Sequence, residues 1–277
     1  MTPASRAGAE DAPVEHHPTH HRVHLLSLKG TPGETVALPN AFSVPIRTDL
    51  IRRAVVAARA SQRQPHGTTP TAGRRHSVQW SGKGKGVSRT PRLMGSMTGA
   101  QAPNTVGGAP AHPPRVATIW TKKINTKERR LAFASALAAT REGKLARLRG
   151  HDIPEGLHLP VVLESPVEEI ATSADARGLL DRLHLWADVE RAGDGIHQRA
   201  GRGKVRGRPR RFPRSLLLVT SSPGKARGFR NLPGVDVVPV GRLGTEDLAP
   251  GGDPGRLTLI SHIALESLRT RLEGSAA

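Results

Sequence analysis

The chain has 277 residues, with 42 Lys or Arg against 23 Asp or Glu, so its formal net charge is +19. It contains no cysteine, which excludes disulfides and thiolate metal sites. It also contains no run of about 18 apolar residues, so no membrane-spanning helix is predicted. The N-terminus lacks the apolar stretch of a signal peptide, and the 36% hydrophobic and 3% aromatic content predicts a lean core, so we expect a soluble intracellular protein.

Residues 1–21 are rich in Ala, Pro and His without periodicity, which predicts a disordered tail. Nearby histidines could bind a metal ion, but nothing fixes their geometry, so loose surface histidines are expected at His16, His17, His20, His21 and His24. Two short strands, RVHLLSL (22–28) and ETVAL (34–38), are predicted around the turn KGTPG. RTDLIRRAVVAARASQR (47–63) has apolar residues at helical spacing, which predicts a helix that ends near Gln62.

The second half of the chain contains more elements of both kinds. NTKERRLAFASALAAT (125–140) predicts a helix capped by Asn125 or Thr126, with an apolar face of Leu131, Ala134, Leu137 and Ala138. SADARGLLDRLHLWADVERA (173–192) predicts one amphipathic helix with Leu179, Leu180, Leu183 and Trp186 inward, and SHIALESLRTRL (261–272) predicts a closing helix. Strands are predicted at LPVVLES (159–165), SLLLVTS (215–221), VDVVPV (235–240) and RLTLIS (256–261). This alternation favours an α/β layer fold with a largely parallel sheet.

Charge is distributed very unevenly along the chain. Residues 50–127 contain 14 Lys or Arg and no carboxylate, and residues 195–235 contain 11 Lys or Arg and again no carboxylate. The other 158 residues hold 17 basic and 23 acidic side chains, a net charge of −6. The sequence therefore predicts a mildly acidic body with two basic segments, which favours a polyanionic partner, most often a nucleic acid.

Within the first basic segment, about 50 residues, from 63 to 115, lack helical or strand periodicity. Loops longer than about 15 residues are uncommon unless they are functional or disordered. Nothing in this composition would fold the segment alone, so we expect an extended internal loop whose partner supplies shape and negative charge. Residues 195–214 are predicted to form a second, shorter basic loop within the body.

Glycine and lysine in these segments do not match the nucleotide-binding motifs. No apolar run precedes Gly82 in GKGKGVSRTPR (82–92), and Pro91 stands where a helix would begin. RAGRGKVRGRPRR (199–211) departs from G-x-G-x-x-G and contains seven basic residues. Both are better explained as ribbons along a nucleic-acid backbone, where glycine permits close approach and arginine donates to phosphates. An irregular ribbon favours folded RNA over a regular duplex groove.

Catalytic motifs are weak. The histidines His66, His76, His112 and His151 are scattered, and carboxylates such as those of PVEEI (166–170) are expected on a solvated helix face. Among the aromatic residues Trp80, Trp120 and Phe229, base stacking is favoured only for Trp80, and Trp120 fits a core position equally well. No enzyme activity, small-molecule substrate or cofactor is therefore expected.

Two other classes of protein remain open on the residues alone. An architectural DNA-binding protein would prefer duplex DNA and form an ordered dimer. A nucleotide-binding α/β protein would lose its ligand on Lys83→Ala and Lys204→Ala.

Nine segments, in order, resemble the archaeal and eukaryotic branch of the L4 family of the large ribosomal subunit, over about residues 22–272. They are 38–65, 82–92, 104–114 (NTVGGAPAHPP), 125–140, 149–151 (RGH), 159–165, 199–208, 230–237 (RNLPGVDV) and 248–260 (LAPGGDPGRLTLI). The chain ends soon after ALESLRTRL without a long basic tail, so it is expected to be archaeal.

The resemblance implies a three-layer, Rossmann-like body at 22–62 and 116–272. The N-terminal tail (1–21), which has no counterpart in the family, and a C-terminal tail (273–277) are expected outside this body. The resemblance implies a loop at 63–115 that threads into ribosomal RNA and helps line the polypeptide exit tunnel, and a second RNA-binding loop at 195–214. It also implies a structural, non-catalytic role in the cytoplasmic ribosome, with ribosomal RNA and neighbouring large-subunit proteins as partners.

The expected RNA contacts are cationic except for one tryptophan. They are Arg63, Arg74, Arg75, Trp80, Lys83, Lys85, Arg89, Arg92, Arg115, Lys122, Lys123, Arg199, Arg202, Lys204, Arg206, Arg208, Arg210 and Arg211. The loop tip at the tunnel is expected to be Gly82, Lys83, Gly84, Lys85, Gly86, Arg89 and Arg92. Relatives usually carry basic residues around TVGG and AHPP, whereas residues 93–111 have no charge here, so backbone packing is expected there.

Overall fold

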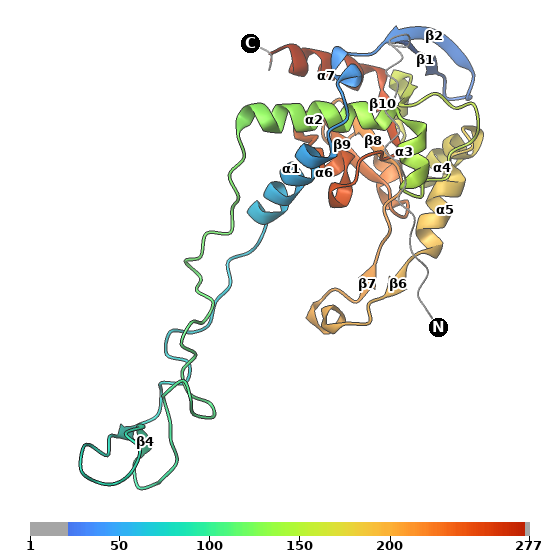
Figure 1. Ribbon diagram of the computed structural model, residues 1–277. Helices are drawn as coiled ribbons and strands as arrows, with labels where there is room; N and C mark the ends of the chain where they lie inside the picture. The colour runs from blue at the N-terminus through green and yellow to red at the C-terminus, as the bar shows by residue number, and fades with distance from the viewer. Residues whose placement is uncertain (1–21, 275–277) are drawn as a thin grey trace, which may run out of the picture. The chain divides into compact units, whose positions relative to one another are not determined.

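The computed structural model describes residues 22–274 (Figure 1). The predicted N-terminal tail, with His16, His17, His20 and His21, lies outside the described residues. The chain forms two compact units, one running to Val56 and resuming at Ile124, the other Ala57–Lys123. The predicted loop limits, 63 and 115, both fall within the second unit.

A six-stranded sheet forms the centre of the first unit. Its order is β2-β1-β5-β10-β8-β9, and every neighbouring pair is parallel except β1 with β2. The strands are β1 (Arg22–Leu26), β2 (Pro32–Ala37), β5 (Val161–Leu163), β8 (Leu217–Thr220), β9 (Asp236–Pro239) and β10 (Thr258–Ser261). The predicted α/β fold with a largely parallel sheet is confirmed.

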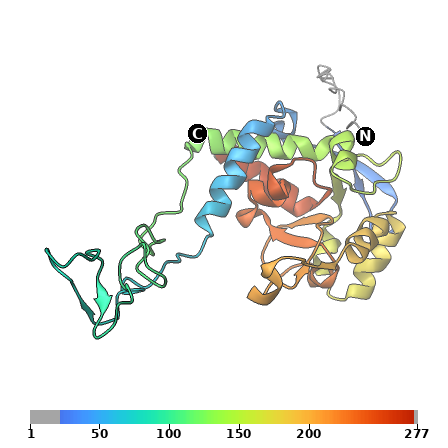
Figure 2. The same ribbon diagram turned by 60° about the horizontal axis from the view of Figure 1, so that its bottom comes forward.

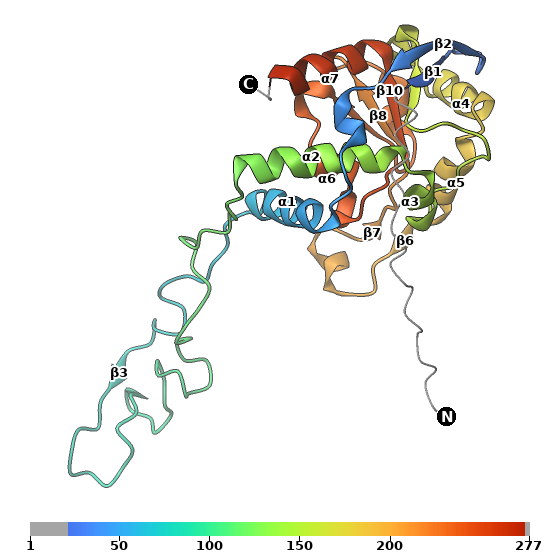
Figure 3. The same cartoon turned by 45° about the horizontal axis from the view of Figure 1, so that its top comes forward.

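Helices cover both faces of this sheet (Figures 1 and 3). The α-helices are α1 (Thr48–Ser61), α2 (Thr126–Arg141), α3 (Gly143–Leu148), α4 (Ser173–Arg182), α5 (Trp186–Asp194), α6 (Thr245–Leu248) and α7 (His262–Gly274). Short 3-10 helices are η1 (Asn40–Ser43), η2 (Ser165–Glu169), η3 (Arg202–Arg206), η4 (Arg227–Asn231), η5 (Val240–Arg242) and η6 (Pro250–Gly252).

The two faces of the sheet belong to two separate apolar clusters, because successive residues of a strand point to opposite sides. Val161 and Leu163 pack in the cluster that includes residues of α4 and α5, whereas Val162 between them packs with residues of α1, α2 and α7. Figure 2 shows the sheet between these helices. All residues of β5, β8 and β10 are buried, which explains why their sequences are short apolar runs rather than alternating patterns.

Helix α2 begins as predicted, but its buried face is partly different. The Asn125 side-chain oxygen accepts a hydrogen bond from the Lys127 backbone N–H at 3.2 Å, which is an N-cap. Leu131 is 38% exposed, so its prediction as a core residue is wrong. Small side chains take its place: Ala132 and Ala136 are completely buried, together with the predicted Leu137.

The single helix predicted over residues 173–192 is wrong at its centre. The chain forms α4 and α5 with a break at His184, which has the left-handed φ of +55°. Leu185 N–H donates to the Leu180 carbonyl and His184 N–H to the Asp181 carbonyl, the pattern of a Schellman stop. The break allows both Leu183 and Leu185 to be buried, which one continuous helix face would not permit.

Among the helices of residues 22–274, none combines the length and apolar character needed to cross a bilayer.

Candidate nucleic-acid interface

The long loop, residues 63–115, presents its cations to solvent. The predicted contacts Arg63, Arg74, Arg75, Lys83, Lys85, Arg89 and Arg115 are exposed, as are Lys122 and Lys123 just beyond it. Within residues 22–274, none of these side chains forms an ion pair with a carboxylate. Arg92 differs, because it is half-buried and donates to the Met97 carbonyl at 2.5 Å. Nine exposed cations therefore have no carboxylate partner among the described residues, although Arg63 and Arg75 make other contacts, and Arg92 also shapes the loop.

The loop tip owes its shape to alternating glycines. Gly82, Gly84 and Gly86 all have left-handed φ values, +69°, +79° and +65°. A Cβ added at any of them would meet no atom within 4 Å, so backbone conformation rather than crowding within the chain requires glycine here. The Ser81 hydroxyl donates to the Ser88 carbonyl at 3.2 Å and closes the turn. Lys83 and Lys85 consequently stand between glycines on a bare, narrow backbone.

The uncharged segment 93–111 packs against the other arm of the same loop. Strands β3 (Val78–Gln79) and β4 (Arg92–Leu93) pair antiparallel, and the Gln101 side chain donates to the carbonyls of Arg74 and His76 at 3.2 and 2.5 Å. A Cβ on Gly108 would lie 1.9 Å from the Ala102 carbonyl oxygen. This close approach leaves no room for a side chain at position 108, whereas Met94, Met97 and Val106 of the same segment are exposed, so packing alone does not account for the absence of charge.

An aromatic and cationic stack joins the two arms nearer the ends of the loop. The Trp120 ring lies 5.1 Å from the His66 ring at an angle of 11°, and the Arg63 guanidinium lies 3.7 Å from the Trp120 centroid. Thr68 N–H donates to the Pro114 carbonyl at 2.9 Å beside this stack. Trp120 is thus used within its own unit, whereas Trp80 is 65% exposed and available for base stacking. Phe229 is fully buried in the body, in agreement with the expectation that it does not stack on bases.

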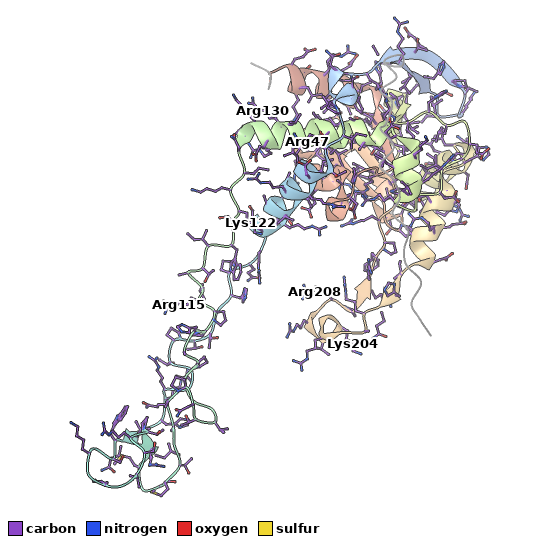
Figure 4. All side chains as sticks on the ribbon, viewed as in Figure 1. Arg47, Arg115, Lys122, Arg130, Lys204 and Arg208 are labelled. Atoms are coloured by element: carbon purple, nitrogen blue, oxygen red, sulfur yellow. The ribbon has the colours of Figure 1, made fainter. Side chains whose placement is uncertain are left out.

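The second, shorter basic loop, residues 195–214, is a hairpin. Strands β6 (His197–Gln198) and β7 (Arg210–Arg211) pair antiparallel, and Arg199 N–H extends the ladder to the Pro209 carbonyl at 2.8 Å. The predicted cations Arg199, Arg202, Lys204, Arg206, Arg208, Arg210 and Arg211 are all exposed. Figure 4 shows Lys204 and Arg208 at the head of this basic hairpin. Within the described part of the chain, none of the seven pairs with a carboxylate.

A buried carboxylate fixes the root of the basic hairpin. Asp188 on α5 is fully buried and accepts from the Ser215 hydroxyl at 2.7 Å, from Arg191 at 2.8 Å and from the Asp152 N–H at 3.1 Å. Its other partner is the His151 ring, with Nδ1 at 3.1 Å. Burial alone would raise the pKa of Asp188, but the hydrogen bonds and charge around it hold that pKa below its ordinary value.

Further ion pairs tie the chain where the hairpin rejoins the sheet. Arg214 pairs with Asp236 on β9 at 2.5 Å. The buried Arg256 also pairs with Asp236, at 2.6 Å, and donates to the Ser215 carbonyl at 3.0 Å. Burial lowers the pKa of Arg256, which Asp236 opposes. The hairpin therefore starts from a rigid part of the body.

The cluster of His151, Asp188 and Ser215 is not a catalytic triad. The carboxylate stands between the histidine and the serine, whereas nucleophilic catalysis needs the histidine in the middle. All three side chains are buried, and they anchor structure instead. Sequence spacing gave no signal for this cluster because its members lie 27 and 37 residues apart.

Glu168 corrects the expectation that the carboxylates of PVEEI are solvated. It is buried at the carboxyl ends of three adjacent parallel strands and accepts from the Ser221 N–H, the Ser221 hydroxyl and the Ser261 hydroxyl at 2.7, 2.6 and 2.5 Å. Burial would raise the pKa of Glu168, but these hydrogen bonds and nearby Lys225 keep it below the usual value. Its oxygens are occupied by the protein, so it ties strands together.

Among residues 22–274, no group of three or more His, Asp or Glu side chains is placed to hold a metal ion. His24 alone of the predicted tail histidines is described.

Fold and surface together define the class: a small α/β body with two carboxylate-free segments, in which the predicted RNA-contact cations have no carboxylate partner among residues 22–274. The comparisons agree with this class. The model of the ribosomal protein L4/L1 family matches residues 36–271. The chain is 45% identical over 254 residues to the large ribosomal subunit protein uL4 of Methanopyrus kandleri, which covers 90% of this chain and 98% of the relative. It is 42% identical over 248 residues to uL4 of Thermoplasma acidophilum, covering 90% and 97%.

The chain belongs to the ribosomal protein L4/L1 family. This is a family of structural, non-enzymatic proteins of the large ribosomal subunit in the cytoplasm, and the archaeal relatives agree with the expected archaeal branch.

Proposed function

We propose that this protein binds ribosomal RNA through the long loop and the basic hairpin, supports assembly of the large subunit, and lines part of the polypeptide exit tunnel with residues 82–92. The observation that supports RNA binding is the concentration of exposed cations in the long loop and the basic hairpin, which contain no carboxylate; within residues 22–274 Arg214 alone of the exposed cations in this loop and hairpin pairs with a carboxylate. Each cation that meets a phosphate releases condensed counterions, which favours binding.

The backbone of both segments suits an irregular RNA surface. The tip offers lysines between glycines in open, left-handed positions, so phosphates can approach its backbone closely. Gln101 of the neutral part of the loop is hydrogen-bonded to the Arg74 carbonyl of the other arm, and exposed Trp80 offers a ring to an unstacked base. The 158 residues outside 50–127 and 195–235 carry a net charge of −6, so this part of the chain suits neighbouring ribosomal proteins rather than RNA alone.

The first experiment follows where the protein sediments in a cell lysate. We expect the full chain to co-sediment with large subunits, and a variant without charge in both basic segments to shift to the top of the gradient. Sedimentation of the natural chain away from large subunits at low salt, or its retention on duplex DNA instead, would contradict the proposal and favour an architectural DNA-binding protein.

The tunnel assignment has a direct test because the chain contains no cysteine. In assembled ribosomes that hold a stalled nascent chain with one cysteine, Lys85→Cys at the tip should cross-link to the nascent chain through a short bismaleimide. Lys204→Cys on the basic hairpin is the matched control and should not cross-link. Equal cross-linking at both positions, or at neither, would remove the tip from the tunnel wall while leaving RNA binding untouched.

A further inference from the structure

A cavity of about 470 Å³ opens beside β1 and the C-terminal end of α2, and none of the residues that line it is a predicted RNA contact. Four basic or imidazole side chains line it: Arg22, His24, Arg141 and His158. No Asp or Glu contributes to its wall. This volume is within the range of small-ligand sites, about 300–1,000 Å³.

A second, more apolar compartment of about 300 Å³ adjoins the first. The two compartments share Val23, His24, Leu157 and His158, and the second adds Leu26, Pro32 and Val161 in place of the two arginines. One side of the combined cavity is therefore cationic and the other is apolar, with the histidine pair on their common wall.

The arginines are available to an external anion. Arg22 is exposed and Arg141 is half-buried, and within residues 22–274 neither forms an ion pair or a side-chain hydrogen bond. Arg141 lies in the last turn of α2, where a cation also complements the helix dipole. That role does not explain why Arg22, from a different element, lines the same cavity.

The histidine rings form a wedge between the two compartments. Their centroids are 6.3 Å apart and their planes are inclined by 48°. Both side chains are exposed, so the rings can tilt onto a planar group that enters between the arginines and the apolar wall. Imidazole rings are among the side chains on which nucleobases stack.

We propose that this cavity binds a nucleotide, with its phosphate on Arg22 and Arg141 and its base against His24, His158 and Leu157. The same chemistry is offered by a free nucleotide and by an unstacked nucleotide of an RNA chain. A bare phosphate would not need the apolar compartment, and an apolar ligand would not need two guanidinium groups. The site goes beyond the proposed RNA contacts, because none of its residues lies in the long loop or the basic hairpin.

The test uses the purified full-length chain and reads the site locally, because the basic segments also attract phosphates. Adenosine 5′-monophosphate is titrated while the ring signals of His24 and His158 are followed by NMR. We expect both rings to shift saturably. Arg22→Gln, at an exposed position, should weaken the midpoint about tenfold, and Arg22→Gln with Arg141→Gln should weaken it further. Arg242→Gln, an exposed arginine elsewhere on the body, should leave the midpoint unchanged.

Further results distinguish a free nucleotide from a nucleotide of an RNA chain and decide whether the proposed site exists. Ring shifts with a short single-stranded RNA but not with the mononucleotide would support the site as one for an RNA nucleotide. Inorganic phosphate acting as strongly as the nucleotide would overturn the proposal, as would ring signals that move in neither titration or equally in the Arg22→Gln variant. Co-sedimentation with large subunits is measured in parallel, so failure of the proposed ribosomal function and failure of this site are separate results.

Discussion

The long loop and the basic hairpin expose the same kind of cationic side chains, but different contacts hold each segment in place. Both are free of carboxylates, and within residues 22–274 the predicted RNA-contact cations that they expose have no carboxylate partner. The hairpin starts from a root fixed by the buried Asp188 and by the ion pairs of Asp236. The long loop is held by contacts within its own unit, such as the Gln101 hydrogen bonds and the Trp120 stack. Charge alone therefore does not reveal how a binding segment is supported.

The largest predicted effect is on RNA binding when cations are removed, and it should be the same for the long loop and the basic hairpin. Lys83, Lys85, Arg89 and Arg115 changed to Gln in the loop, or Arg202, Lys204, Arg206 and Arg208 changed to Gln in the hairpin, each remove four exposed cations. Either set should reduce the steepness of log affinity for ribosomal RNA against log salt concentration by about 3–4. Each phosphate contact that is lost no longer releases counterions on binding.

The matched control for this experiment is a set of four exposed cations outside residues 50–127 and 195–235, with the same charge loss: Lys29, Lys144, Arg147 and Arg242 changed to Gln. This set should leave the salt slope nearly unchanged. A slope that falls equally in the control would show that net charge, and not the two segments, governs binding.

The second predicted effect is on stability, and it should differ between the root of the basic hairpin and the long loop. Asp188→Asn leaves His151 and Arg191 without their carboxylate in a buried site, which should lower the free energy of unfolding of the body by about 3 kcal/mol. Urea unfolding measures this change, and exposed Asp194→Asn is the control. The four-cation loop variant should unfold like the natural chain, and a loss similar to that of Asp188→Asn would contradict the division.

The same carboxylate predicts a pH dependence with a definite sign. Since the folded pKa of Asp188 lies below its ordinary value, its contribution to stability is complete above about pH 4 and is lost as the pH falls through the folded pKa. In Asp188→Asn this part of the acid destabilisation should be missing, and an unchanged acid limb would count against the role of Asp188.

Much of the fold could be predicted because its signals are local. Buried strands such as Leu217–Thr220 appear as short apolar runs, and Asn125 begins α2 as a capping residue should. The break at His184 could not be predicted, because Leu179, Leu180 and Leu183 fit one helical face and only the burial of Leu185 against the body requires a turn.

The candidate interface divides in the same way. Exposure of the cations followed from the lack of nearby carboxylates, and the charge gap at 93–111 was visible as a pattern. The approach of Gly108 to Ala102 and the hydrogen bond from Gln101 to His76 could not be predicted, since they depend on how the loop folds back on itself. The anchor of Asp188, Ser215 and His151 depends on tertiary contacts over 27 and 37 residues and left no sequence pattern.

The smallest predicted effect concerns the frame of the long loop itself. Trp120→Leu removes both the His66 stack and the Arg63 cation–π contact, which is worth about 1 kcal/mol at such an exposed site. Hydrogen exchange at the Thr68 amide, which donates across the arms to Pro114, should become about fivefold faster, while amides of β8 and β10 stay unchanged. Trp80→Leu is the control, because the Trp80 ring is 65% exposed. Equal acceleration by both variants would mean that the loop is not held at this stack, and it would weaken the comparison with the anchored hairpin.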